Sequence, residues 1–260
     1  MIKNLKNAVL EHAPNVIYPI ISSSYWTLNP KKSTKIIIPK DQCWFIWTPT
    51  ETYYTLKNRR LIDRGSTVRQ NDKLDRYTLD GFVEVENGDI VIDIGAFLGE
   101  FSLPAAKIAD NVIAIEPDTR TYDCLVKQVG DVENIITENV LIGAENGKVT
   151  FKMAEDPTES SFINVDRTPY IEKELPIIRL DKFMNDRCIE CIDLLKLDAE
   201  GAEPEVIEGI GDSNIRKVAI DAGSERKGKN TISEVTSILE DRGYEITTEN
   251  QVVFGRKGTV

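Results

Sequence analysis

The stretch VIDIGAFLGEFS, at residues 91–102, has the residue types of a ligand-binding turn. An apolar run ends at Asp93, and Gly95 and Gly99 follow it in a G-x-x-x-G spacing. A turn between a strand and a helix leaves backbone N–H groups free at the helix start, and glycine lets a ligand approach the backbone closely. We therefore expect a ligand at this turn. The helix after it should turn one apolar face to the sheet, made of Phe101, Ala105, Ile108 and Ala109.

The charges near this turn select among three kinds of ligand. A triphosphate loop needs a lysine after its second glycine, and a dinucleotide loop needs a third glycine, but the sequence has neither. A carboxylate at Asp93 would repel a pyrophosphate, whereas Glu116 at the end of the next strand could accept hydrogen bonds from a ribose diol. S-adenosylmethionine, which has a sulfonium, an ammonium and a ribose, is the expected cofactor. The alternative is that Asp93 and Glu116 only cap a turn and a helix.

A second group of reactive side chains lies in LLKLDAEGAE, at residues 194–203. Lys196 interrupts an apolar strand, and Asp198 points to the same face because it is two residues further on. A buried lysine needs a partner, and Asp198 and Glu200 are the expected ones. Removal of a proton from a hydroxyl would use Asp198, Glu200, or a Lys196 whose pKa is lowered by burial. A magnesium ion held by Asp198, Glu200 and Asp221 is a weaker alternative, so no metal ligand is assigned.

Strands and helices alternate from about residue 79, which predicts a mainly parallel, doubly wound α/β sheet. The carboxyl ends of such strands place the acidic residues at one edge of the sheet. Helices are expected from Asp118 to Gly130, from Pro204, and before Gly243. Residues 154–175 are expected to form a loop or lid. Apolar runs predict strands at residues 91–94, 112–116, 135–142, 149–151, 177–180, 193–198, 218–221, 244–247 and 251–254.

The first 75 residues differ from the rest in pattern and charge. They are expected to be irregular apart from short strands at residues 36–39 and 43–47, and to form an extension that packs against residues 76–260 or shapes the substrate pocket. Residues 1–75 have 12 Lys+Arg against 6 Asp+Glu, and the other 185 residues have 20 against 37. An acidic main domain argues against general nucleic-acid binding. The basic segment at residues 57–60 is expected to solvate a surface or to pack electrostatically against the acidic main domain rather than to bind a phosphate.

Hydropathy and cysteine content bear on location. No apolar run is long enough to span a membrane, so no membrane partner is expected. No secretion leader is recognised, so secretion is not expected. The four cysteines fit a reducing cytoplasm. Cys188 and Cys191 form a single C-x-x-C pair. A structural zinc site would need two more ligands nearby, and Cys43 and Cys124 are far away in sequence, so we expect Cys188 and Cys191 to be thiols.

Five segments together resemble the FkbM family of S-adenosylmethionine-dependent methyltransferases. The resemblance runs from about residue 80 to about residue 245, and the K-x-D-x-E-G-x-E spacing is its most specific part. It implies the class I methyltransferase fold, a seven-stranded Rossmann-like sheet with an antiparallel hairpin at its edge. It also implies O-methylation of a hydroxyl on a sugar, a polyketide or another small metabolite. The segments are VIDIGAFLGEFS, VIAIEPD, NVLIGAENGKVTF, IIRLDKFM and IDLLKLDAEGAEPEVIEGI.

The resemblance also implies roles for individual residues. Asn139 and Val140 would lie near the adenine, and Asp198 would lie beside the reacting centre. The sequence departs from many relatives at Phe97, where they have asparagine. It also lacks the histidine that they have in the fifth strand, and its only histidine is His12. The implied cofactor-binding residues are Asp93, Gly95, Ala96, Gly99, Glu116, Pro117, Asn139 and Val140.

Two other functions stay open beside methylation of a small-molecule hydroxyl. A lysine and an aspartate at a strand end also suit an RNA 2′-O-methyltransferase, although the acidic main domain counts against it. A non-catalytic S-adenosylmethionine-binding module would need Asp93 and Glu116 but not Lys196 and Asp198.

Overall fold

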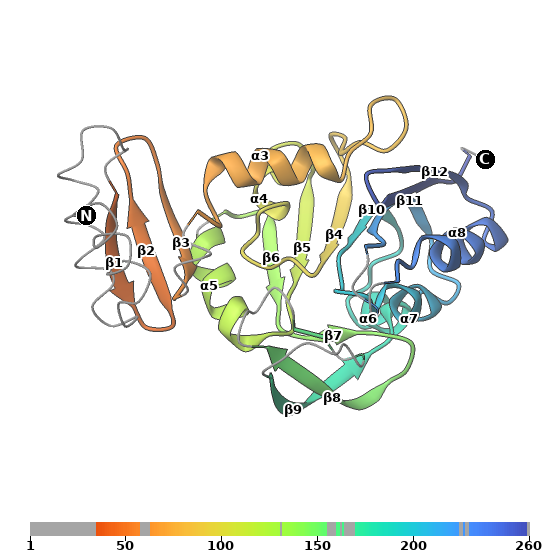
Figure 1. Ribbon diagram of the computed structural model, residues 1–260. Helices are drawn as coiled ribbons and strands as arrows, with labels where there is room; N and C mark the ends of the chain where they lie inside the picture. Colours follow the sequence, from red (N-terminus) through yellow and green to blue (C-terminus); the bar gives the residue numbers. More distant parts are fainter. Residues whose placement is uncertain are drawn as a thin grey trace, which may run out of the picture.

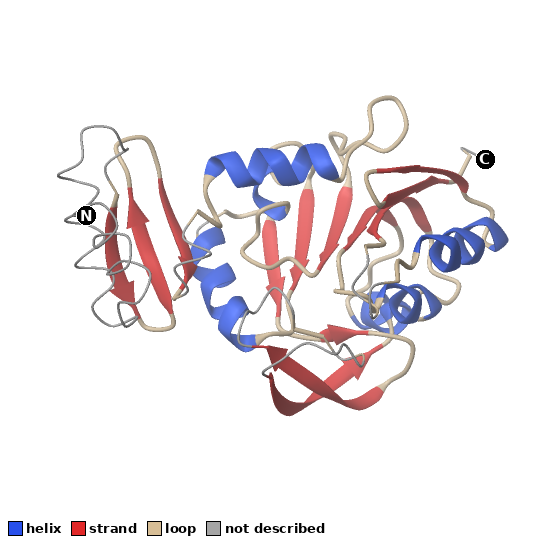
Figure 2. Cartoon of the chain, viewed as in Figure 1, coloured by secondary structure: helices blue, strands red, loops and turns tan. Residues whose placement is uncertain are grey.

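The computed structural model describes residues 35–57, 63–130, 132–154, 160–161, 163, 170–223, 226 and 229–258. His12 and residues 58–60 of the basic segment lie outside these described residues. Figures 1 and 2 show a central sheet with helices around it and two smaller sheets beside it. Within the described ranges, no helix has the length and apolar content needed to cross a membrane.

The central sheet has seven strands in the order β12-β13-β11-β10-β4-β5-β6. The five strands from β11 to β6 run parallel, whereas β13 is antiparallel to both β11 and β12. This arrangement confirms the doubly wound sheet and its antiparallel hairpin edge. The strands are β4 (Ile90–Ile94), β5 (Asn111–Ile115), β6 (Ile135–Glu138), β10 (Ile192–Leu197), β11 (Ile215–Asp221), β12 (Glu245–Glu249) and β13 (Val252–Arg256).

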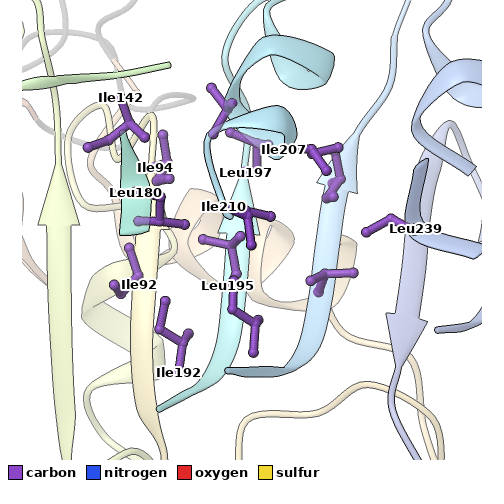
Figure 3. Packing of buried hydrophobic residues seen from close by; sticks show 14 of the residues in the cluster. Ile92, Ile94, Ile142, Leu180, Ile192, Leu195, Leu197, Ile207, Ile210 and Leu239 are labelled. Atoms are coloured by element: carbon purple, nitrogen blue, oxygen red, sulfur yellow. The ribbon is translucent and has the colours of Figure 1, made fainter. Parts of the chain in front are cut away.

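Side chains alternate between the two faces along each strand, and both faces of this sheet carry apolar residues. Helices therefore cover both faces. Ile92 and Ile94 of β4 pack in a cluster with side chains of α6 (Leu180–Asp186), α7 (Glu203–Glu208) and α8 (Ile232–Asp241). Figure 3 shows this cluster, in which Ile207 and Leu239 reach the strands from α7 and α8. The opposite face is covered by α3 (Thr67–Arg76), α4 (Ser102–Ala105) and α5 (Thr119–Val129). Asp93 and Lys196 belong to this second face, where the Lys196 ammonium lies 5.1 Å from the centre of the Tyr77 ring.

A separate antiparallel sheet precedes the main domain. It consists of β1 (Ile36–Lys40), β2 (Cys43–Trp47) and β3 (Thr52–Leu56), which confirms the two predicted strands and adds a third. Figure 1 shows β3 beside α5. Cys43 of β2 and Cys124 of α5 form a disulfide with a Cα–Cα distance of 5.7 Å, and both are fully buried. The prediction of four reduced cysteines is therefore wrong for Cys43 and Cys124, because these residues are 81 positions apart and the sequence does not indicate that they meet. Cys188 and Cys191 are free as predicted.

A third sheet covers the carboxyl edge of the central one and changes two predictions. The expected strand at residues 135–142 is two strands, because β6 stops at Glu138 and β7 (Leu141–Ile142) joins β9 in the third sheet. The Asn139 amide donates to the carbonyls of Glu116 and Pro117, which turns the chain at this point. Residues 170–175 are not a loop, since they belong to β9 (Tyr170–Ile178), which pairs with β8 (Gly147–Ala154).

Three helices differ from the sequence pattern. α6 was not predicted, and the strand expected at residues 177–180 ends at Ile178, so Leu180 begins this helix instead. α3 was not predicted, because Val68 and Leu74 are its only aliphatic residues and no period of 3.6 is visible. α4 is shorter than expected: after Ala105 the chain tightens, and the N–H of Ile108 bonds to the carbonyl of Ala105, three residues back. Ile108 is accordingly 38% exposed, while the three other residues of the predicted apolar face are buried.

Candidate functional site

The glycine turn after β4 is held by close backbone contacts. Gly95 has φ +73°, and a Cβ at this position would lie 1.9 Å from the carbonyl oxygen of Asp198. Gly99 has φ +75°, and a Cβ there would lie 3.1 Å from a methyl carbon of Leu125. The expectation that both glycines admit a ligand is thus incomplete, because Gly95 makes room for the neighbouring strand end and Gly99 makes room for α5.

Two residues without glycine's freedom also adopt left-handed backbone conformations at this edge. Phe97 has φ +53° and Glu200 has φ +51°, and both line the same cavity. Such conformations are unfavourable for most residues and gather at functional sites. The Glu200 loop is held in place by Glu203, whose carboxylate accepts hydrogen bonds from the N–H groups of Ala199 and Gly201.

A cavity of about 110 Å³ lies between these two loops, and the buried carboxylate of Glu116, just after β5, belongs to its lining. Glu116 accepts hydrogen bonds from the N–H groups of Phe97, at 3.0 Å, and Asp118, at 2.9 Å. Burial raises the pKa of Glu116 to about 8, although these hydrogen bonds oppose the rise. The apolar part of the lining includes Phe97, Phe101, Ile115, Val140, Ile142 and Phe151.

Lys196 has a partner that the sequence did not suggest. Its ammonium lies 2.9 Å from the Asp93 carboxylate on the neighbouring strand and donates to the carbonyl of Gly95 at 2.8 Å. Burial by itself would lower the pKa of Lys196, but the carboxylates of Asp93, Asp198 and Asp221 raise it above its ordinary value. The expectation of a lysine base with a lowered pKa is therefore wrong.

Asp93 is also different from expectation. It is fully buried, and its second oxygen accepts a hydrogen bond from the Ser102 hydroxyl at 2.6 Å. Because Lys196 neutralises Asp93 away from the cavity surface, Asp93 cannot select the charge of a ligand as the sequence suggested. Its position supports the turn and fixes the lysine.

Asp198 directly follows β10 and contacts residues of α3 and of the segment just after that helix. Its Oδ2 accepts hydrogen bonds from the Tyr77 hydroxyl at 2.7 Å and from the Lys73 ammonium at 3.3 Å. Burial acts to raise the pKa of Asp198, but Lys73, Lys196 and the Tyr77 hydrogen bond hold it well below its ordinary value. Asp198 is therefore a stable anion at the surface of the cavity.

The phenol of Tyr77 links two strand ends. Its oxygen lies 2.7 Å from Asp198 and 3.1 Å from Asp221 at the end of β11, and Arg76 forms an ion pair with Asp221 at 2.7 Å. Burial, followed by the charges of the two carboxylates, raises the pKa of Tyr77 well above its ordinary value. Lys73, Arg76 and Tyr77 were missed because a charged segment with few apolar residues gives no sign of what it packs on.

Most of the residues predicted to bind or react come together at this cavity. Among the predicted residues, all of which the structure describes, Asp93, Gly99 and Asn139 lie outside the lining and support it from behind. Among the described residues, no group of three His, Cys, Asp or Glu side chains is placed to hold a metal ion. The predicted residues in the lining are Gly95, Ala96, Glu116, Pro117, Val140, Lys196, Asp198 and Glu200.

The strand order, the glycine turn and a carboxylate at the end of the second strand of the parallel sheet define a class I methyltransferase fold. The model of the methyltransferase FkbM domain family matches residues 93–246, which is more than half of the chain. The chain belongs to this family of methyltransferases, and its cofactor is S-adenosylmethionine.

Two relatives are similar over most of their own length. Methyltransferase sdnD of Sordaria araneosa is 25% identical over 200 residues, which cover 61% of this chain and 74% of the relative. The 31-O-demethyl-FK506 methyltransferase FkbM of Streptomyces tacrolimicus is 24% identical over 217 residues, which cover 69% of this chain and 82% of the relative.

Solved structures show similarity at a lower level. Methyltransferase FkbM from Methylobacillus flagellatus KT is 18% identical with a TM-score of 0.46, and the match covers 69% of this chain and 46% of the other. Aeropyrum pernix fibrillarin with natively bound S-adenosyl-L-methionine is 14% identical with a TM-score of 0.46, covering 84% and 97%.

Proposed function

We propose that this methyltransferase transfers a methyl group to a hydroxyl oxygen of a small metabolite, of the kind found in sugars and polyketides. The main supporting observation is the position of Asp198, which lines both the cavity beside the glycine turn and a wider groove next to it. A hydroxyl in the groove would therefore lie close to a ligand in the cavity. The Streptomyces tacrolimicus relative, whose name specifies a 31-O-demethyl substrate, supports transfer to oxygen.

The cavity fits S-adenosylmethionine in the chemistry of its lining. Glu116 would accept hydrogen bonds from the ribose hydroxyls, with Gly95, Ala96 and Pro117 beside it, while Val140 and the aromatic side chains would contact the adenine. The cofactor supplies a methyl carbon that its sulfonium activates towards attack by an oxygen. Asp93, Gly99 and Asn139 would act indirectly, because each supports a backbone segment that lines the cavity.

The charged residues at the strand ends would divide their roles. Lys196 stays an ammonium and holds Asp93 and the carbonyl of Gly95, so it fixes the glycine turn. Asp198 is a weak base because of its lowered pKa, so we propose that it orients the acceptor hydroxyl by accepting its hydrogen bond. Glu200, which lines both spaces, is the better candidate to take up the proton.

Residues 1–75 would contribute to substrate binding through α3. Lys73 near the end of this helix lines both the cavity and the groove. We propose on this basis that the N-terminal extension, taken as residues 1–75, forms one wall of the acceptor site, while residues 76–260 bind the cofactor. An RNA acceptor is the less favoured alternative, because acidic residues outnumber basic ones in the groove.

A cytoplasmic location is a separate proposal, and the two free cysteines support it. The Cys43–Cys124 disulfide argues against it, because disulfides form and persist in oxidising compartments. Thiol trapping in intact cells separates the two locations: a cytoplasmic protein would show four reactive thiols after denaturation, and a protein from an oxidising compartment would show two.

Isotope transfer tests the proposed reaction. The chain is incubated with S-adenosylmethionine labelled in its methyl group and with a set of hydroxyl-bearing sugars and polyketides, and the products are analysed by mass spectrometry. Asp198→Asn should lower the rate of label transfer by about 10²-fold or more, the range for general acid–base and positioning groups. Its affinity for S-adenosylhomocysteine should stay within about tenfold of the wild type. A folded Asp198→Asn variant with normal turnover would show that Asp198 only stabilises the sheet.

A further inference from the structure

The groove beside the cofactor cavity is a second site that the predicted residues do not explain. It has a volume of about 940 Å³ and lies between α3, the ends of β10 and β11, and the turn between β12 and β13. Four residues line both spaces: Arg64, Lys73, Asp198 and Glu200. A molecule in the groove would therefore adjoin whatever binds in the cavity.

The lining of this groove is unusually polar for a ligand site. It contains seven acidic and four basic residues together with Thr78 and Asn250, and its only apolar members are Leu79 and Phe254. Phe254 is only 2% exposed, so it offers little surface to a ligand. Most small-molecule pockets have predominantly apolar linings. An apolar polyketide would have to strip water from these charges without returning hydrogen bonds.

The basic residues of the groove are already engaged by carboxylates. Lys73 pairs with Asp198 at 3.3 Å, Arg76 with Asp221 at 2.7 Å, and Arg64 with Glu100 at 3.0 Å. Arg69, the fourth, lies 3.9 Å from the carboxylate of Asp72. Nucleic-acid binding draws its affinity from cations that neutralise phosphates, and a lining with excess acid and paired cations cannot supply it.

Two carboxylates of the groove lining share one buried hydrogen-bonding partner. The buried Tyr77 hydroxyl lies within hydrogen-bond distance of both Asp198 and Asp221, so it keeps the two strand-end carboxylates side by side. Each of these carboxylates has further acceptor capacity, because an ionised carboxyl group accepts about four hydrogen bonds. A molecule with several hydroxyl groups can donate to these oxygens and accept from the remaining N–H groups of the arginines that line the groove.

We propose that this groove is the acceptor site and that it takes a small, hydroxyl-rich molecule that is neutral or cationic, such as a saccharide or an amino sugar. This inference rests on the proposed function and narrows its acceptor class. The residues that recognise the acceptor come largely from α3, which lies outside the part of the chain that the family model matches.

Ligand-observed saturation-transfer NMR on the full chain, saturated with S-adenosylhomocysteine, tests the proposal. The probes are methyl α-glucoside, glucosamine, glucose 6-phosphate, a macrolactone aglycone and a short single-stranded RNA. The expected result is binding of the neutral and cationic sugars, with at least about tenfold weaker binding of the other three.

Two variants locate the binding. Asp72→Trp should fill the groove from an exposed helix position and weaken sugar binding at least about tenfold, while affinity for S-adenosylhomocysteine stays unchanged. Arg69→Trp, at another exposed groove position, serves if Asp72→Trp does not fold. Glu240→Trp is the matched control, because it places the same side chain on an exposed position of α8, away from the groove.

Each other outcome overturns the acceptor class, the acceptor site or the proposed function. Stronger binding of the macrolactone, the RNA or the phosphorylated sugar would overturn the acceptor class. Sugar binding that persists in both groove variants, or no sugar binding by a protein that binds S-adenosylhomocysteine, would overturn the acceptor site and leave the methyltransferase function standing. Failure to bind S-adenosylhomocysteine at all would contradict the proposed function itself.

Discussion

The cofactor cavity and the acceptor groove lie side by side but are built in different ways. The cavity of about 110 Å³ is formed by the turns that follow β4, β5 and β10, with many apolar side chains and backbone segments in its lining. The groove of about 940 Å³ is formed mainly by charged side chains, many of them on α3. The cavity depends on backbone conformation and the groove on side-chain chemistry. Some substitutions should therefore impair ligand binding in one of the two and leave binding in the other unchanged.

The largest effect is expected at Gly95, where the space beside the backbone admits a hydrogen atom but no side chain. Gly95→Ala would place a methyl group 1.9 Å from the carbonyl oxygen of Asp198 at a residue with φ +73°. We expect a loss of about 2–5 kcal/mol in the free energy of unfolding, from backbone strain and overpacking together.

Gly88→Ala is the control for this substitution. Gly88 also has a positive φ, +92°, but a Cβ there would meet no atom within 4 Å. The expected loss is about 1–2 kcal/mol, from the backbone conformation alone. Equal losses in the two variants, measured by urea denaturation, would show that the contact between Gly95 and Asp198 is not important.

The next effect concerns the attachment of the N-terminal sheet to the cavity. The buried Cys43–Cys124 disulfide joins β2 to α5 and packs against Leu98 of the glycine turn. Cys43→Ser should lower the free energy of unfolding by about 2–4 kcal/mol, because the cross-link closes a loop of about 80 residues. Cys188→Ser, at an exposed free thiol, should change it by less than about 0.5 kcal/mol. Similar stability of Cys43→Ser and the wild type would mean that the sheet is held by packing alone.

The smallest effect is a pH dependence that belongs to the cavity and not to the groove. Burial raises the pKa of Glu116 to about 8, so this carboxyl group becomes protonated in the empty protein below that pH. A ligand that donates hydroxyl hydrogens to the ionised form should bind more weakly as the pH falls below about 8, by up to about tenfold per pH unit.

Calorimetry with S-adenosylhomocysteine at pH 6.5 and 8.5 measures this dependence. Glu116→Gln should remove it. Glu203→Gln is the control. Burial also raises the pKa of Glu203 to about 8, but Glu203 lies outside the cavity lining, so this variant should keep the pH dependence. A dependence that is unchanged in Glu116→Gln would mean that another group controls cofactor binding.

The sequence predicted those parts of the molecule that depend on local pattern. The apolar runs from β4 to β13 gave the doubly wound sheet, and Gly95, Glu116 and Asp198 were placed correctly at its carboxyl edge. What it could not predict depends on contacts between distant segments. The partner of Lys196 is Asp93, which lies beside it only because β10 pairs with β4 in one particular register.

The groove was hidden for the same reason. α3 has few apolar residues and looks like a solvated segment, yet Lys73 and Arg76 on it and Tyr77 just after it contact Asp198 and Asp221, more than 120 residues later in the chain. The pairing of Cys43 with Cys124 across 81 residues is another case. Charged and isolated residues show no periodicity, so only the folded chain reveals their partners.

Separate binding of cofactor and acceptor is the central claim, and one calorimetric titration tests it most directly. S-adenosylhomocysteine is titrated into the wild type, Glu116→Ala and Asp72→Trp. We predict micromolar-range binding to the wild type, loss of binding in Glu116→Ala, and unchanged binding in Asp72→Trp. Loss of binding in Asp72→Trp with retention in Glu116→Ala would contradict the account, as would tight binding of NAD by a protein that does not respond to S-adenosylhomocysteine.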